Sequence, residues 1–159
     1  MHSFLKDVGD FFTNPVMICA VFAWLAAQVL KIFFSPKYRK DMSFLRFIVG
    51  SGGMPSSHSA TVCALAMSSA ISCGLKSFEF AVTVVLAFIV MRDASGVRRS
   101  AGEQAKIINR MIRTLSQGGT IDFNSDIKEI IGHTPFQVFV GAILGAAVPF
   151  LMMLIMPVR

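Results

Sequence analysis

The sequence predicts an all-α integral membrane protein with about four transmembrane helices and one interfacial amphipathic helix. Its 159 residues are 54% hydrophobic, and the apolar residues come in long blocks instead of being spread along the chain. A protein of this size would lack the polar helix faces needed to cover such blocks in water. We therefore expect a single membrane-embedded domain that comprises residues 1–159.

The first and the last apolar blocks are each long enough to cross a bilayer. Residues 16–34 are interrupted only by Gln28 and Lys31, and residues 134–157 carry no charged side chain. Lys31 is equally well explained as a side chain that extends to the membrane interface and as a phosphate ligand.

The two middle blocks, residues 59–75 and 80–91, are marginal as single spans. We expect them to pair across a tight turn at residues 74–77. Farther along, residues 100–116 have an amphipathic helical pattern. Its apolar residues are Ile107, Ile108, Met111, Ile112 and Leu115, and basic residues surround them. Such a helix is expected to lie in the membrane interface.

The distribution of basic residues predicts the orientation. Four spans place residues 36–57 and 93–133 on one side of the membrane, and eleven of the fifteen Lys and Arg residues lie in or next to these segments. By the positive-inside rule this side is cytoplasmic. The expected location is a bacterial inner (plasma) membrane, since no targeting feature is evident. Nucleic-acid binding is not expected, because the basic residues form no aromatic-interleaved groove.

The stretch Gly52–Ala60 predicts a phosphate site. It is a glycine-proline turn that leads into the start of a helix. The first N–H groups of a helix have no intrahelical partner and the helix dipole is positive there, so phosphate binds readily. Ser56 and Ser57 are candidate caps and phosphate ligands, and His58 stands where it could exchange a proton with a bound ester.

Two further polar motifs fall on the same predicted side. Residues 92–99 (Arg-Asp-Ala-Ser-Gly-Val-Arg-Arg) form an expected glycine turn, and residues 132–138 (Gly-His-Thr-Pro-Phe-Gln-Val) open the last block. Three segments, residues 52–60, residues 93–99 with 101–105, and residues 132–141, resemble the motifs of the divergent branch of the type-2 phosphatidic acid phosphatase family, which is related to vanadium haloperoxidases. The resemblance covers essentially the whole chain. It implies a compact helical membrane fold and metal-free hydrolysis of a phosphate monoester or pyrophosphate through a phosphohistidine.

The resemblance also implies roles for individual residues. His133 matches the nucleophile, and His58 matches the histidine that protonates the leaving oxygen. Lys31 resembles the basic element of the family's first motif, and Arg98 or Arg99 would supply the guanidinium that holds phosphate. Basic residues nearby should keep His133 neutral at neutral pH.

The chain departs from the superfamily pattern at Gln137, where a carboxylate is expected four residues after the nucleophile. A carboxamide oxygen accepts the same hydrogen bond but does not stabilise an imidazolium charge. In serine proteases the analogous Asp-to-Asn change costs about 10⁴ in turnover. Glu129 or Asp93 could substitute, although Asp93 could equally cap the following turn. No Arg lies just upstream of His133, and Lys128 is the nearest basic residue there.

The leading hypothesis is a membrane lipid phosphatase that acts on an anionic lipid phosphate: phosphatidylglycerol phosphate, phosphatidate or an isoprenoid phosphate. The alternative is a non-catalytic membrane module that binds phospholipid or a partner protein, and a small transporter is least favoured. No cofactor is expected, and the resemblance implies a reaction without metal. The three cysteines also lack metal-ligand spacing. Gly141 and Gly145 indicate close helix packing, either within the chain or between subunits of a homodimer.

Overall fold

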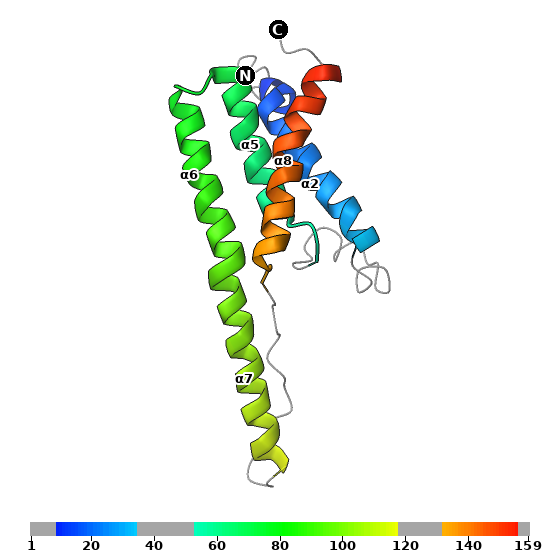
Figure 1. Cartoon of the computed structure of the whole chain (residues 1–159), viewed down its shortest axis with the longest axis vertical. Helices are drawn as coiled ribbons and strands as arrows, with labels where there is room; N and C mark the ends of the chain where they lie inside the picture. Colours follow the sequence, from blue (N-terminus) through cyan, green and yellow to red (C-terminus); the bar gives the residue numbers. More distant parts are fainter. Residues whose placement is uncertain (1–8, 35–52, 118–131, 156–159) are drawn as a thin grey trace.

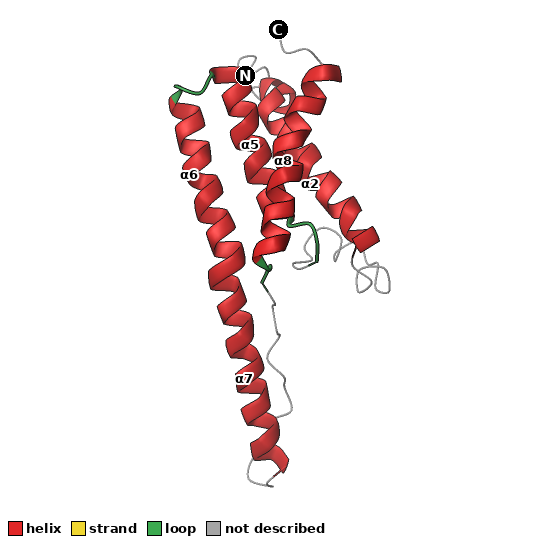
Figure 2. Cartoon of the chain, in the orientation of Figure 1, coloured by secondary structure: helices red, strands yellow, loops and turns green. Residues whose placement is uncertain are grey.

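The computed structural model describes residues 9–34, 53–117 and 132–155. Every regular element within these residues is helical (Figure 2), as the sequence predicts. After a short helix over residues 9–13, the elements are α2 (Pro15–Phe34), α5 (Ser57–Cys73), α6 (Phe78–Arg92), the π-helix η1 (Asp93–Val97), α7 (Arg98–Gln117) and α8 (Pro135–Ile155).

Four of these helices correspond to the four predicted spans. By length and composition, three segments of the described chain could cross a membrane: Pro15–Phe34, the continuous helix Phe78–Leu115, and Pro135–Ile155. The remaining one, α5, has 17 residues and is rich in Ser and Ala. It is packed against α2, α6 and α8, so its small and polar side chains are shielded by protein. The protein is therefore an all-α membrane protein.

The helices run alternately up and down (Figure 1). The start of α2, the connection between α5 and α6, and the end of α8 all lie at one end of the bundle, and the starts of α5 and α8 lie at the other. The connection is the tight turn that the sequence predicts. Gly74 adopts a positive φ of 86°, and Ser77 caps α6 by accepting a hydrogen bond from Phe80 N at 3.1 Å.

The bundle is tightest where α5 crosses α8. A Cβ atom at Gly141 would overlap the backbone carbonyl of Ser56, and one at Gly145 would lie 2.8 Å from the carbonyl carbon of Ala60. Both glycines therefore permit helix packing within this chain, which leaves the homodimer without support from them. The core beside this contact is built from small side chains: Ala23, Ala27, Ala60, Ala64 and Val148.

The glycine turn predicted after the third span is absent. Instead, α6, η1 and α7 form one continuous helix that extends well beyond the other helices (Figure 1). Local hydrogen bonds keep this segment helical: Ser95 Oγ donates to the carbonyl of Met91 at 2.9 Å, and Arg98 N donates to the carbonyl of Asp93. A π-helix contains extra residues per turn, so it changes the direction in which the following side chains point. Arg98 directly follows the π-helix, so the direction of its side chain is affected.

The predicted amphipathic helix is present as α7, with its apolar residues Ile107, Ile108, Met111 and Leu115 exposed. It continues along the axis of α6 (Figure 1) and is not a separate, angled element. Its position in a membrane interface stays a prediction.

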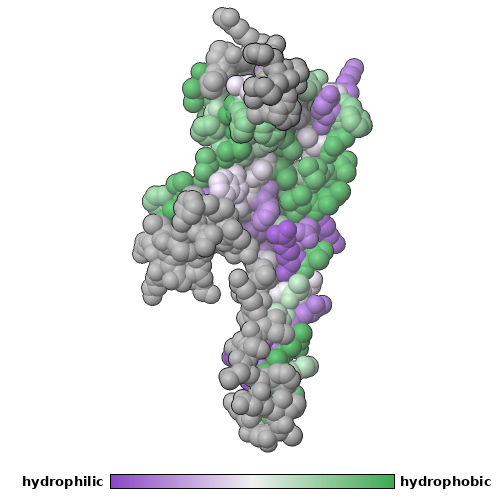
Figure 3. Space-filling view, turned by 180° about the vertical axis from the view of Figure 1, so that it is seen from behind, coloured by the Kyte–Doolittle hydropathy of each residue, from purple (hydrophilic) through white to green (hydrophobic). Residues whose placement is uncertain are grey.

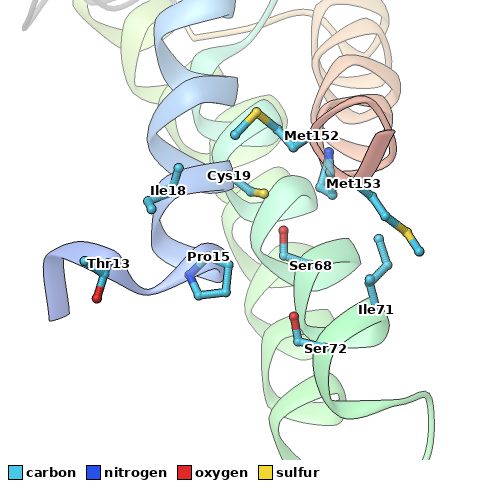
Figure 4. A pocket seen from close by; sticks show the side chains of 10 residues that line it. Thr13, Pro15, Ile18, Cys19, Ser68, Ile71, Ser72, Met152 and Met153 are labelled. Atoms are coloured by element: carbon cyan, nitrogen blue, oxygen red, sulfur yellow. The ribbon is translucent and has the colours of Figure 1, made fainter. Parts of the chain in front are cut away.

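The surface and the interior differ between the two ends of the bundle. In Figure 3, apolar side chains cover most of the upper part of the bundle, and hydrophilic side chains gather at about mid-height of the molecule. At the upper end, a cavity of about 100 Å³ lies between α2, α5 and α8 (Figure 4). Its lining is mainly apolar and includes Ile18, Cys19 and Met152. The chemically distinctive residues lie at the opposite end.

Candidate phosphate-transfer site

The three sequence motifs meet where α5 and α8 begin, beside η1. Ser56 N donates to the carbonyl of Gln137 at 3.1 Å, and His133 N donates to the carbonyl of Ala94 at 3.0 Å. A Cβ atom at Gly132 would overlap the backbone of Arg99, so only glycine allows the chain before α8 to approach α7 this closely. Backbone contacts thus join segments that are far apart in the sequence.

His133 is the most enclosed polar side chain of the last motif, with 3% of its surface exposed. Its Nδ1 atom lies 3.2 Å from Oε1 of Gln137. Its Nε2 atom is buried and has no hydrogen-bond partner among the described residues. Burial lowers the pKa of His133 to about 4. The hydrogen bond with Gln137 raises the pKa, and the positive charges of Lys31, His58 and Arg98 lower it further. His133 is therefore neutral at pH 7, and burial contributes more to this than the basic residues on which the sequence-based expectation rested.

His58 faces His133 across the site. The centroids of the two rings are 6.4 Å apart, and the ring planes are inclined by 63°. Nη1 of Arg98 lies 3.5 Å from Nε2 of His58, and Nδ1 of His58 is buried without a partner among the described residues. An imidazole of α5 and one from the segment before α8 thus lie next to each other.

The two adjacent arginines point in different directions. Arg98 contacts His58, and its Nε donates to Oδ2 of Asp93 at 2.7 Å. Arg99 pairs instead with Glu103, one turn along α7, at 3.1 Å. The sequence left open which arginine reaches the site; Arg98 is the one beside the imidazoles. The carboxylate of Asp93 forms an ion pair with Arg98. The described hydrogen bonds of His133 are with Gln137 and Ala94, so Asp93 does not take the place of the expected carboxylate.

Lys31 lies inside the protein, with none of its surface exposed. Its Nζ donates to Oγ of Ser57 at 2.9 Å, which ties α2 to the first turn of α5. The ammonium group is therefore held next to the residue that precedes His58, and it does not extend to the surface.

Ser56 and Ser57 have different contacts. Ser56 is the N-cap of α5, where its Oγ accepts from Ser59 N at 3.4 Å and from Ser59 Oγ at 3.0 Å. Ser57 uses its hydroxyl to accept from Lys31. Ser56 thus closes the end of the helix, and Ser57 links the helix to a cation.

One contact of the site was missed from the sequence. Thr134 N donates to Oε1 of Gln137 at 3.1 Å, and Gln137 N donates to Oγ1 of Thr134 at 3.3 Å. Thr-x-x-Gln directly before an apolar run is the pattern of a helix capping box, so the contact could have been found. Glu129 and Lys128 lie outside the described residues.

The chain matches the Divergent PAP2 family over residues 12–148. It is 37% identical over 148 residues to YuiD, an uncharacterized membrane protein of Bacillus subtilis (strain 168), in an alignment that covers 86% of this chain and 92% of that protein. No solved structure matches the chain. The protein belongs to the Divergent PAP2 family.

Proposed function

We propose that this protein is a membrane lipid phosphatase that hydrolyses a phosphate monoester through a phosphohistidine. The observation that carries the proposal is the pairing of His133 and His58. The Nε2 atom of His133 is buried and has no hydrogen-bond partner among the described residues, and a second imidazole stands 6.4 Å away, centroid to centroid. A nucleophile beside an acid–base group is the arrangement that covalent phosphoryl transfer requires.

In the proposed reaction, Nε2 of His133 attacks the phosphorus atom, and the bond from phosphorus to the lipid oxygen breaks. His58, in its protonated form, gives its proton to that oxygen. His58 then takes a proton from a water molecule, whose oxygen attacks the phosphohistidine. The products are the lipid alcohol and inorganic phosphate, and His133 is regenerated. The neutral state of His133 at pH 7 suits its role in the first step.

Positive groups around the two imidazoles support the binding of a phosphate. The guanidinium of Arg98 lies beside His58, and the ammonium of Lys31 is buried beside Ser57. The N-terminus of α5 adds the partial positive charge of a helix dipole. Phosphoryl transfer depends mainly on positioning the phosphate and on stabilising the negative charge of its oxygens. Positive groups that are already in place provide this stabilisation without reorganising during the reaction.

The location of the site favours a lipid substrate. His58 and His133 lie at the starts of helices α5 and α8, where a phosphate headgroup would sit while its hydrocarbon chains remained among the apolar helix surfaces. With the basic side cytoplasmic, the site faces the leaflet in which phosphatidylglycerol phosphate is made, and we propose this lipid ahead of phosphatidate and isoprenoid phosphates. The proposed location is a bacterial inner membrane.

A second function is favoured by Gln137. The carboxamide orients His133 without adding negative charge, so the site could hold a phosphate and turn it over poorly. In that case the protein would be a phospholipid-binding membrane module.

The two functions are separated by assaying the purified protein in detergent for release of inorganic phosphate from a panel of lipid phosphates, with binding of vanadate measured in parallel. We expect release that His133→Ala and His58→Ala both abolish or strongly reduce. Arg110→Ala, which removes an exposed cation on α7, serves as the matched control. Vanadate binding without phosphate release from any lipid would favour the binding module, and the absence of both would reject both functions.

A further inference from the structure

The first turn of α8 contains a reciprocal pair of hydrogen bonds that reaches the reactive histidine. Gln137 N donates to Oγ1 of Thr134 at 3.3 Å, and Thr134 N donates to Oε1 of Gln137 at 3.1 Å. This is a capping box, in which the residue before the helix and the third residue of the helix satisfy each other's backbone N–H groups. Here the glutamine oxygen has an additional neighbour, Nδ1 of His133, at 3.2 Å.

The backbone N–H of Thr134 determines which end of the carboxamide faces inward. A backbone N–H only donates, and the amide nitrogen of glutamine does not accept a hydrogen bond. The atom that meets Thr134 N must therefore be the oxygen of Gln137. Since the same oxygen lies against Nδ1 of His133, that nitrogen has to carry the proton. The other ring nitrogen, Nε2, is then left with its lone pair free.

We propose that the backbone N–H of Thr134 is the positioning group that fixes His133 as the Nδ1–H tautomer, because it holds the carboxamide oxygen of Gln137 against Nδ1. The inference rests on the proposed function only for its catalytic consequence, because Nε2 must be unprotonated to attack phosphorus. The tautomer itself can be observed without any turnover. In this arrangement a neutral glutamine replaces the orienting function of a carboxylate, and the charge-stabilising function is missing.

The experiment is ¹⁵N NMR of histidine-labelled protein in detergent at pH 7. The His133 signals are assigned by their loss in His133→Asn. We expect Nδ1 of His133 to be protonated and Nε2 to be unprotonated, in both the wild type and Thr134→Ser. Thr134→Pro removes the backbone N–H that holds the carboxamide oxygen of Gln137, and the ratio of Nδ1–H to Nε2–H forms should fall by about fivefold or more, the effect of one lost hydrogen bond. Thr134→Val loses the capping hydroxyl but keeps this N–H, so it should keep the wild-type ratio.

Ser77→Ala is the matched control. It removes the N-cap of α6, where Phe80 N donates to Ser77 Oγ at 3.1 Å, and so causes a similar loss of helix capping away from the site. Like Thr134→Val, it should lower the melting temperature but leave the His133 tautomer unchanged.

Two results would overturn the proposal. One is a wild-type protein whose His133 is protonated at Nε2, and the other is a folded Thr134→Pro variant with the wild-type tautomer ratio. If the tautomer behaves as expected but no lipid phosphate is hydrolysed, the positioning role stands and the proposed function fails. If both hold, kcat should fall in Thr134→Pro and be retained in Thr134→Ser, with KM nearly constant.

Discussion

The imidazole rings of His58 and His133 lie with their centroids 6.4 Å apart, although the two residues are 75 positions apart in the sequence. Each ring has one buried nitrogen without a hydrogen-bond partner among the described residues, Nδ1 in His58 and Nε2 in His133. Buried polar atoms in folded proteins are nearly always paired, so two such atoms in one place are candidates for hydrogen bonds with a ligand. A phosphate monoester can form such bonds.

Replacing either histidine by alanine should lower the rate of hydrolysis, but only for His58 should the size of this effect depend on the leaving group. His58→Ala should lower the hydrolysis of a lipid phosphate by about 10²–10⁴, the usual contribution of general acid–base catalysis. The loss should be much smaller with p-nitrophenyl phosphate, because nitrophenolate leaves without being protonated. His133→Ala should be inactive on both. Steady-state rates with the two substrates measure this, and equal losses in His58→Ala would contradict its role as the acid.

Replacing Gln137 by Glu should raise the pKa of His133 from its value of about 4, because a carboxylate beside Nδ1 stabilises the imidazolium form. The capping box should survive, since Glu and Gln both serve at this position. We expect faster phosphate release from Gln137→Glu, toward the level expected of a His–carboxylate pair. Histidine NMR titration and the rate of phosphate release are the measurements. A slower enzyme with an unchanged titration would contradict the assigned role of Gln137.

The low pKa of His133 also predicts how stability depends on acid. In the unfolded chain this imidazole has a pKa of about 6.5, and in the native protein about 4, so between these values the unfolded state binds more protons. Stability contributed by the neutral buried ring is therefore present above about pH 6.5 and is lost as the pH falls toward 4. The melting temperature in detergent should decrease over this range. His133→Ala should show a smaller decrease, and an identical decrease in both proteins would refute the assignment.

Gly141→Ala should destabilise the protein because a Cβ atom there would overlap the carbonyl of Ser56, which begins α5. Overpacking of this kind costs about 1–3 kcal/mol. Because α5 carries His58, the variant should lose phosphatase activity before it unfolds. The control is Gly96→Ala in η1, where the nearest atom to the added Cβ would be 4.0 Å away. Thermal denaturation of both variants tests this; equal stability would mean that the α5–α8 contact is looser than described.

The proposed orientation can be tested with thiol labelling of intact cells. Native Cys73 is exposed at the end of α5 near the turn to α6, opposite to the histidines. In a Cys19→Ala, Cys63→Ala background, an impermeant maleimide should label Cys73 from outside. Arg110→Cys, with Cys73 also replaced by Ala, should react only after the cells are opened. The reverse pattern would place the site outside the cell and remove the argument for phosphatidylglycerol phosphate.

The sequence alone determined the helical membrane fold, the positions of the four spans and the motifs that meet at one end. These features depend on neighbouring residues alone, such as the apolar length of residues 16–34 or the glycine and serine at the ends of the turn Gly74–Ser77. The capping box at Thr134 and Gln137 is also local, and it could have been read from the spacing alone.

Tertiary structure decided the rest. A glycine beside polar residues predicted a turn at Asp93–Arg99, but the backbone continues as a π-helix that Ser95 and the carbonyl of Asp93 hold together. Which of the two arginines reaches His58 depends on that π-helix and on the close approach of Gly132 to the α7 backbone. Lys31 is likewise buried because α5 presents Ser57 to it. The direction of a side chain is set by packing between segments distant in sequence, and no local pattern contains that information.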